Sequence, residues 1–243
     1  MKLIINADDF GLSTPVNKAI DICVKNGWIQ RTTLMINMPQ TKEAVKLAKQ
    51  NKYMNKVGLH INLIEGIPLT DKIKQTSLCN DHGEFNGLFF KITSHRFFLK
   101  KDEREAVKEE VEAQIKRYIS YGFETIHMDS HQHSHVNMSV FFTILNLAQK
   151  YNFKSIRLSR NLPVSEIKGM KNIYKKFINQ KIIQFNKSYF CGNTRQFFGS
   201  KGDCEKENIN KTKFEDSIVE MMVHPTAYNG KIIDNFTHMR LFD

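Results

Sequence analysis

Histidines are concentrated in one short segment of this chain. Four of its nine histidines fall within the nine residues His127-Met128-Asp129-Ser130-His131-Gln132-His133-Ser134-His135. Neutral imidazole binds Zn²⁺ and similar ions, and a carboxylate completes sites for harder ions. If the segment were extended, His131, His133 and His135 would lie on one face, because alternate residues of a strand share a side. The alternatives are a solvated histidine-rich loop or an adventitious metal site. The pattern favours a metal-binding segment.

Two adjacent carboxylates, Asp8 and Asp9, come shortly after the predicted strand 2–6. Carboxylates next to a buried strand are costly unless they are paired or bind a metal. The alternative is a pair of acids that favours the start of a helix near Ser13. From this dipeptide alone, both interpretations stay open.

Further polar residues lie on other predicted strands. Asn37, Arg157 and His224 lie at or near strand ends, whereas His60 lies inside the strand 57–63 and Asn62 shares its side. Taken alone, His60 is typical of a hydrogen-bonded core histidine, and His224 is equally ambiguous. In parallel α/β sheets, however, sites form at the carboxyl ends of the strands. The polar features together therefore predict a metal-dependent hydrolase. The residue types do not say which histidines bind the metal or which bond breaks.

Strands and helices alternate along most of the chain. The hydrophobic pattern predicts strands over 2–6, 29–37, 57–63, 123–128, 155–158 and 218–223. It predicts helices from Ser13 to Gly27 and over 41–50, 102–120, 139–151 and 163–186, with Asp102 as a cap. Residues 65–100 are predicted to be a long loop with short local elements. This order indicates an α/β fold with a parallel sheet covered by helices, as in a (β/α) barrel, and one domain over 1–243.

The net charge of +11 is confined to one part of the chain. Residues 150–213 hold fifteen Lys or Arg and four Asp or Glu, so the rest of the chain is neutral. The protein is therefore not uniformly basic like one that coats nucleic acid. The basic segment could be a solvated helix face, a surface that binds an acidic glycan, nucleic acid or membrane, or the mouth of a pocket for a phosphorylated or acidic sugar.

Targeting and redox features indicate a cytoplasmic protein. The apolar run at the N-terminus is too short for a signal peptide, and no stretch approaches the ~20 apolar residues of a membrane span. Four cysteines are scattered without a C-x-x-C pair, which is typical of reduced thiols in the cytosol.

Several segments, in order, resemble the YdjC family, whose best-known members are carbohydrate deacetylases such as chitooligosaccharide deacetylases. The resemblance rests on Ile5-Asn6-Ala7-Asp8-Asp9-Phe10-Gly11-Leu12-Ser13, Thr32-Thr33-Leu34-Met35-Ile36-Asn37, Gly58-Leu59-His60-Ile61-Asn62-Leu63, Gly66-Ile67-Pro68-Leu69, the segment 127–135 and Met222-Val223-His224-Pro225. These blocks extend from residue 5 to residue 225. The Ile156-Arg157-Leu158 strand still matches the family pattern, but residues 160–213 after it depart from that pattern. The segment 160–213 could set the choice of sugar.

The resemblance implies a TIM-like or distorted seven-stranded (β/α) barrel, related to the polysaccharide-deacetylase fold. It implies Mg²⁺ or Zn²⁺ held by Asp9, His60 and His131, with Asp8 as general base and His224 as general acid. Substrate contacts or orientation of ligands would fall to Asn37, Asn62, Asp129, His133, His135 and Arg157.

The implied reaction is hydrolysis of the acetamide of an N-acetylated sugar or oligosaccharide, with release of acetate. The implied partners are that small molecule and a second copy in a homodimer, with no nucleic acid and no membrane. The alternatives are a metal-dependent hydrolase of another amide or ester, and a glycan- or anionic-surface-binding protein that uses 150–213.

Overall fold

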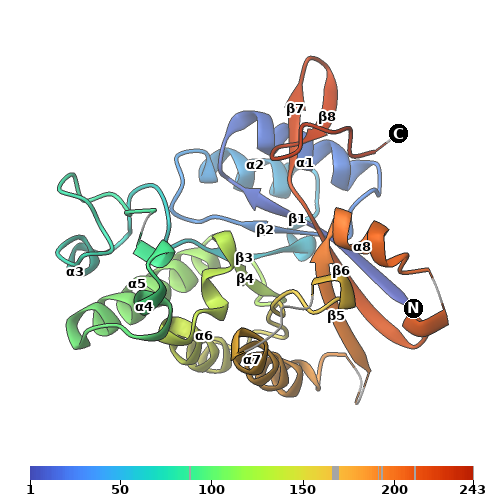
Figure 1. Ribbon diagram of the computed structural model, residues 1–243. Coiled ribbons are helices and arrows are strands. Elements are labelled where there is room, and N and C mark those ends of the chain that lie inside the picture. Colours follow the sequence, from blue (N-terminus) through green and yellow to red (C-terminus); the bar gives the residue numbers. More distant parts are fainter. Residues whose placement is uncertain (88, 166–169, 191, 193, 211, 243) are drawn as a thin grey trace.

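Six parallel strands form one curled sheet at the centre of the molecule (Figure 1). The structure is a computed structural model that describes residues 1–87, 89–165, 170–190, 192, 194–210 and 212–242. The sheet order is β4-β3-β2-β1-β6-β5. The strands are β1 (Lys2–Phe10), β2 (Arg31–Leu34), β3 (Val57–Ile61), β4 (Met128–Ser130), β5 (Arg195–Ser200) and β6 (Ser217–Val223). The predicted α/β barrel-like fold is confirmed in this open form.

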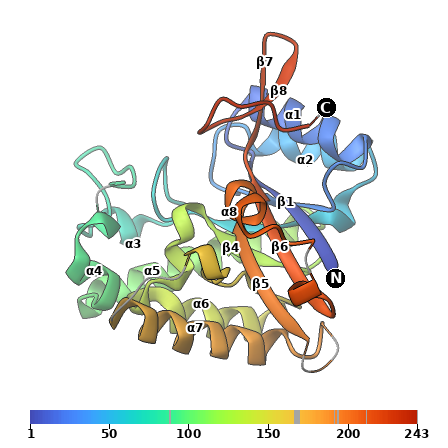
Figure 2. The same cartoon turned by 45° about the vertical axis from the view of Figure 1, so that its right-hand side comes forward.

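Helices cover the sheet and connect its strands. They are α1 (Thr14–Lys25), α2 (Thr41–Gln50), α3 (Asp71–Lys74), α4 (Thr93–Phe97), α5 (Lys101–Ser120), α6 (Met138–Lys150), α7 (Met170–Asn186) and α8 (Lys201–Glu207). Helix α1 packs beside β1, α5 beside β3, and α8 beside β5 and β6. Helices α5, α6 and α7 lie next to one another (Figure 2). None of the helices in the described ranges is long and apolar enough to span a membrane.

Strand β3 is buried along its whole length. It pairs with β2 on one edge and β4 on the other, and α5 packs against it, as expected for a central strand of a parallel sheet. Gly58 allows it to approach the segment before β4, because a Cβ at Gly58 would lie 2.8 Å from the backbone oxygen of His127. Real Cβ atoms do not come that close, so a larger residue would push β3 out of place. The glycine therefore fixes the position of His60, two residues further along the strand.

Several predicted boundaries were wrong. The strand expected over 123–128 begins at Met128 and ends at Ser130, so Asp129 lies within it. The segment 155–158 pairs with β4 through a single bridge at Ile156. Helix α5 begins at Lys101, and the side chain of Glu103, rather than that of Asp102, accepts the backbone N–H of the residue before the helix. Of the helix expected over 163–186, residues 166–169 lie outside the described part, and α7 begins at Met170.

The C-terminal part of the chain forms elements that the sequence pattern did not predict. Strand β5 and helix α8 precede β6, and β7 (Pro225–Tyr228) and β8 (Lys231–Asp234) form an antiparallel hairpin after it. The hairpin packs against α1 and stands beyond the end of β6 (Figure 1). Its turn residues Asn229 and Gly230 have positive φ values of 47° and 73°, the backbone that Asn-Gly favours in tight hairpins.

Candidate metal centre

A bulge in β1 turns both Asp8 and Asp9 toward the carboxyl end of the sheet. The register of β1 with β2 shifts between Ala7 and Phe10, and Asp9 has a left-handed φ of 67°. In a regular strand, adjacent side chains point to opposite faces. A bulge re-aims one of them, and aspartate tolerates the left-handed region better than most residues. The two carboxylates therefore reach one site.

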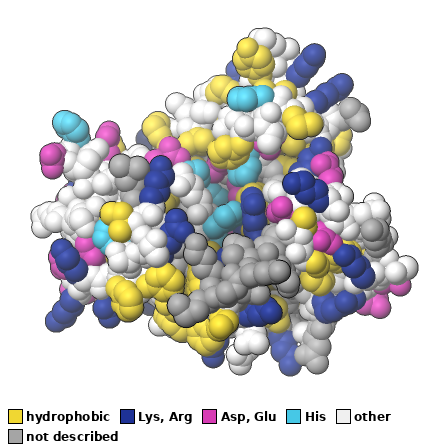
Figure 3. Space-filling model, viewed as in Figure 1, with side chains coloured by type: hydrophobic (Ala, Val, Ile, Leu, Met, Phe, Trp, Pro, Cys, Tyr) yellow, Lys and Arg dark blue, Asp and Glu magenta, His cyan; other side chains and the backbone are white. Residues whose placement is uncertain are grey.

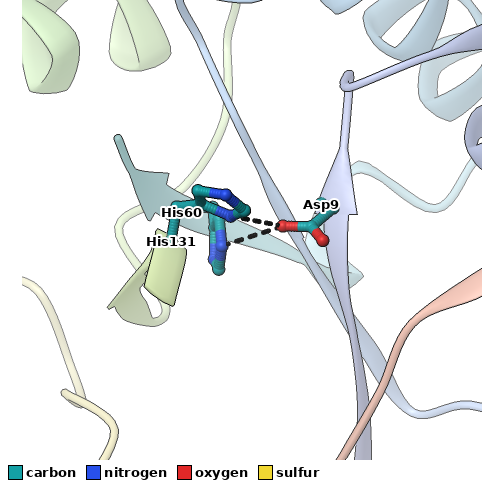
Figure 4. A group of neighbouring side chains, drawn as sticks. All are labelled: Asp9, His60 and His131. Carbon is teal, nitrogen blue, oxygen red and sulfur yellow. Dashed lines mark hydrogen bonds and ion pairs between the residues drawn. The ribbon is translucent and has the colours of Figure 1, made fainter. Parts of the chain in front are cut away.

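Asp9 faces two histidine rings, and both approach the same carboxylate oxygen (Figure 4). Its Oδ1 is 3.2 Å from Nε2 of His60 and 2.9 Å from Nδ1 of His131. His60 comes from β3, and His131 follows the last residue of β4. All three residues are buried, and a single carboxylate oxygen faces two imidazoles.

These three residues fit a divalent metal ion. One ligand atom from each lies within 4.8 Å of the other two. One carboxylate and two imidazoles are donors that Zn²⁺ and related ions accept, and they leave coordination positions for water and substrate. The arrangement could therefore hold a catalytic metal of the kind that activates water.

Asp129 of β4 orients His60. Its Oδ1 lies 2.6 Å from Nδ1 of His60, and its Oδ2 accepts a hydrogen bond from Thr33 at 3.1 Å. Burial would lower the pKa of His60, but Asp129 and Asp9 outweigh it and raise the pKa to about 10. With Nδ1–H donating to Asp129, Nε2 is the nitrogen that faces Asp9. Carboxylates commonly fix metal-binding histidines in this way.

Glu65 contacts His131 from the other side. Its Oε1 lies 2.7 Å from Nε2 of His131. Burial would lower the pKa of His131, but the hydrogen bonds with Asp9 and Glu65 raise it to about 9. Conversely, burial would raise the pKa of Asp9, but His131 and His60 hold it well below its usual value. Glu65 was not predicted, since nothing in the pattern of 62–70 distinguishes it.

Arg157 joins three buried carboxylates behind the site. Its Nη1 lies 2.6 Å from Oδ2 of Asp8, and its Nη2 lies 2.7 Å from Oδ1 of Asp8 and 2.7 Å from Oδ2 of Asp129. Its Nε lies 2.6 Å from Oε1 of Glu220. Burial would raise the pKa of Asp8, but Arg157 outweighs it and holds the pKa well below its usual value. The one sequence signal for Glu220 was an acid inside the apolar strand 218–223.

His224 lies beside Asp8 at the end of β6. Its Nε2 is 3.9 Å from Oδ2 of Asp8, and its backbone N–H donates to Asp234 at 3.3 Å. The ring of Phe236 meets the His224 ring edge-on, with centroids 4.5 Å apart. Asp234 also accepts the backbone N–H groups of Phe236 and Thr237, so the end of the hairpin holds Phe236 against His224.

His131, His133 and His135 do not share a face, because the chain turns after β4. Gln132 and His133 have left-handed φ values of 49° and 55° within a 3₁₀ turn over His131–Val136. His135 points away from the site and is 3.0 Å, through Nε2, from the backbone oxygen of Arg157. Burial lowers the pKa of His135 to about 4, so it stays neutral at physiological pH.

Asn37 and Asn62 shape the loop beside the metal centre. Asn62 Nδ2 donates to Asn37 Oδ1 at 3.1 Å and to the backbone oxygen of Glu65 at 2.7 Å. Asn62 Oδ1 accepts the backbone N–H groups of Ile64 and Glu65. The two asparagines thus hold the backbone that carries Glu65.

A pocket of about 500 Å³ opens over these residues. Six of the predicted residues line it: Asp8, Asp9, His60, His131, His133 and His224. Phe236 and Met239 from the C-terminal segment line it as well. In the space-filling view, histidines gather in a hollow with Lys and Arg side chains at its edges (Figure 3). The volume is in the range of small-molecule sites.

A second, basic pocket of about 230 Å³ adjoins the first. The two share Gln132, His133 and Arg160, and the second is lined by further cations at Lys91, Arg96 and Lys175. None of its described lining residues is Asp or Glu. The basic segment 150–213 therefore contributes to both pockets, and Arg157 from the same segment is buried in the ion-pair network.

A curled parallel α/β sheet with an Asp-His-His cluster at the carboxyl ends of its strands defines a candidate metal-dependent enzyme of the barrel class. The chain belongs to the YdjC-like protein family, whose model matches residues 2–240.

Three of its relatives are named carbohydrate deacetylases. The protein of Vibrio cholerae (strain ATCC 39541) is 38% identical over 154 residues, which are 63% of this chain and 57% of the relative. That match thus spans little more than half of the relative's length. The protein of Halalkalibacterium halodurans is 33% identical over 96% of this chain and 88% of its own length. The protein of Thermoanaerobacter pseudethanolicus is 30% identical over 96% of this chain and 84% of its own length.

A solved structure shares the fold. It is described as a putative cellobiose-phosphate cleavage protein from Enterococcus faecalis V583, and it is 24% identical with a TM-score of 0.69. The match covers 94% of this chain and 82% of the other.

Proposed function

We propose that this protein is a metal-dependent carbohydrate deacetylase that hydrolyses the acetamide of an N-acetylated sugar or oligosaccharide. The observation that carries the proposal is the convergence of Oδ1 of Asp9 with both histidine rings at a pocket that Asp8 and His224 also line. The printed names of the relatives support carbohydrate deacetylation.

Asp9, His60 and His131 would hold the metal. A divalent metal bound there supplies Lewis-acid polarisation of the acetamide carbonyl and lowers the pKa of a water molecule. Asp8 remains ionised, because Arg157 donates to both of its oxygens. It can therefore orient the attacking water and accept its proton as general base. Imidazole is the commonest general acid, and His224, 3.9 Å from Asp8, would give a proton to the departing amine.

Arg157 and Asp129 have the role of supports in this account. Both are fully buried, and neither lines the pocket. Arg157 fixes Asp8, and Asp129 fixes His60. Each supporting residue thus holds a side chain assigned to metal binding or proton transfer. His133 lines the pocket and would contact the sugar.

The basic pocket favours a sugar with an acidic substituent. A substrate whose acetamide lies at Asp9 can extend past Gln132 and His133 toward Lys91, Arg96 and Arg160. Charge-assisted hydrogen bonds from arginine suit phosphate and carboxylate groups. The identity of the sugar, the choice of Mg²⁺ or Zn²⁺, the homodimer and the cytoplasmic location stay predictions.

A panel of acetamido sugars tests the proposal. Metal-depleted protein is supplied with Mg²⁺ or Zn²⁺, and acetate is measured for neutral, phosphorylated and carboxylated N-acetyl sugars. Asp9→Asn is the matched variant, because asparagine also tolerates the left-handed backbone at this position. We expect acetate release by the wild type and none by Asp9→Asn. Release from simple amides or esters but from no sugar would favour the other hydrolase class. Sugar binding without release of acetate would favour a binding protein.

A further inference from the structure

We propose that Glu65 is a positioning residue for His131, holding its ring so that Nδ1 is the nitrogen presented beside Asp9. The inference rests on the metal centre of the proposed function. The contact is direct, since Oε1 of Glu65 lies 2.7 Å from Nε2 of His131. A carboxylate only accepts hydrogen bonds, so Nε2 carries a proton there and Nδ1 is left to bind a metal.

The two histidines are held in the same way by different carboxylates. His60 has Nδ1 on Asp129 and Nε2 facing Asp9. His131 has Nε2 on Glu65 and Nδ1 facing Asp9. Each ring therefore has one nitrogen on a supporting carboxylate and the other on the shared ligand. Such partners fix the tautomer and raise the basicity of the ligating nitrogen.

The loop that carries Glu65 is fastened by buried polar groups. Gln114 of α5 donates to the backbone oxygen of Asn62 at 2.7 Å and accepts its backbone N–H at 3.0 Å. Gln114 also donates to Glu110, whose carboxylate accepts the backbone N–H groups of Leu69 and Thr70. Asn62 in turn binds the backbone of Glu65. These contacts hold both ends of the loop and bring Glu65 to the ring.

Glu65 is the more exposed of the two supports. Its side chain is 43% exposed, whereas that of Asp129 is fully buried. Removing Glu65 therefore leaves no buried charge without a partner, because His131 keeps its contact with Asp9. A role in positioning should appear in metal binding and change the stability of the fold little.

The test measures metal binding without any sugar. Metal-depleted wild type, Glu65→Ala and Glu65→Gln are titrated with Zn²⁺ by calorimetry, and Co²⁺ absorption spectra report the coordination geometry. Glu105→Gln is the matched control, because it removes an acid that pairs with Lys72 on the surface. We expect Glu65→Ala to bind Zn²⁺ about 10- to 100-fold more weakly with an altered Co²⁺ spectrum. Glu65→Gln, which keeps an acceptor oxygen, should lie between Glu65→Ala and the wild type, and Glu105→Gln should match the wild type.

Two outcomes would overturn the inference. If Glu65→Ala binds Zn²⁺ within twofold of the wild type and gives the same Co²⁺ spectrum, Glu65 does not position His131. If the wild type binds no divalent metal, the inference falls with the metal centre. A wild type that binds metal with the expected effect of Glu65→Ala, yet releases no acetate from any sugar, would contradict the proposed function and leave this inference intact.

Discussion

Arg157 donates to both carboxylate oxygens of Asp8, at 2.6 and 2.7 Å, in a buried bidentate ion pair. The same guanidinium contacts Asp129 and Glu220, so one cation contacts three buried acids. Arginine suits this position because its planar donors match carboxylates, which an ammonium group cannot do. The pair connects the group proposed as general base to the support of His60.

Loss of this cation should destabilise the protein strongly. In Arg157→Met the three acids would be left without it, and removal of one partner from a buried ion pair costs about 3–5 kcal/mol. Urea unfolding measures the change in the free energy of unfolding. Lys72→Met is the control, since it breaks an exposed pair with Glu105 and should change stability by less than about 1 kcal/mol. Equal stability of Arg157→Met and the wild type would contradict the ion-pair network.

Because His135 is buried in its neutral form, the free energy of unfolding of the metal-free protein should fall in mild acid. Burial lowers its pKa to about 4, whereas an unfolded histidine has a pKa near 6.5. Between these values the unfolded chain binds the proton and the folded chain does not, so stability falls as pH falls from about 6.5 to about 4. Urea unfolding at pH 7.5 and 5.0 should show a smaller loss for His135→Gln than for the wild type. Equal losses would show that His135 does not contribute.

Phe236 should affect substrate binding more than folding. It is exposed and lines the pocket, and its ring packs perpendicular to that of His224. We expect Phe236→Ala to raise KM about 3- to 10-fold, as an aromatic contact of about 0.5–1.5 kcal/mol implies, with little change in thermal stability. Tyr228→Ala removes another exposed aromatic of the hairpin, outside the pocket, and should leave KM unchanged. An unchanged KM in Phe236→Ala would exclude a sugar contact.

The cations of the second pocket should distinguish acidic from neutral sugars. Arg96→Gln and Lys91→Gln each remove one charge from that pocket. We expect each to lower kcat/KM for a phosphorylated or carboxylated acetamido sugar about 10-fold, as loss of a charged hydrogen bond implies, and to leave the neutral sugar unaffected. Lys116→Gln, on the exposed side of α5, is the matched control. Equal effects on both sugars would contradict an anion-binding pocket.

The sequence pattern predicted that candidate residues from distant segments meet at the carboxyl ends of strands, because polar groups there interrupt apolar runs, and the structure brings Asp8, Asp9, His60, His131 and His224 to one pocket. It could not predict how Asp8 and Asp9 both face the site, since that depends on the register of β1 against β2 and on a left-handed Asp9. The prediction that His131, His133 and His135 share one face was wrong for a similar reason. Two left-handed residues turn the chain where an extended strand was assumed.

The supporting residues depend on contacts between distant parts of the chain. Arg157 and Asp8 are separated by 149 positions, and nothing local to either residue identifies the other as its partner. Glu65 contacts His131 from a loop that is fastened by Gln114 and Asn62. Composition and periodicity describe elements one at a time, so they reveal the candidate ligands but not the groups that hold them.

Hydrolysis in ¹⁸O-labelled water is the most direct test of the central claim. Metal-loaded protein is incubated with a reactive acetamido sugar, and mass spectrometry measures the acetate while a second assay counts free amines. Attack by water on the acetamide predicts acetate with one ¹⁸O atom, formed in equal amount with new amine, in the wild type and not in Asp9→Asn. Absence of acetate with every sugar and metal, or equal acetate from Asp9→Asn, would contradict the account.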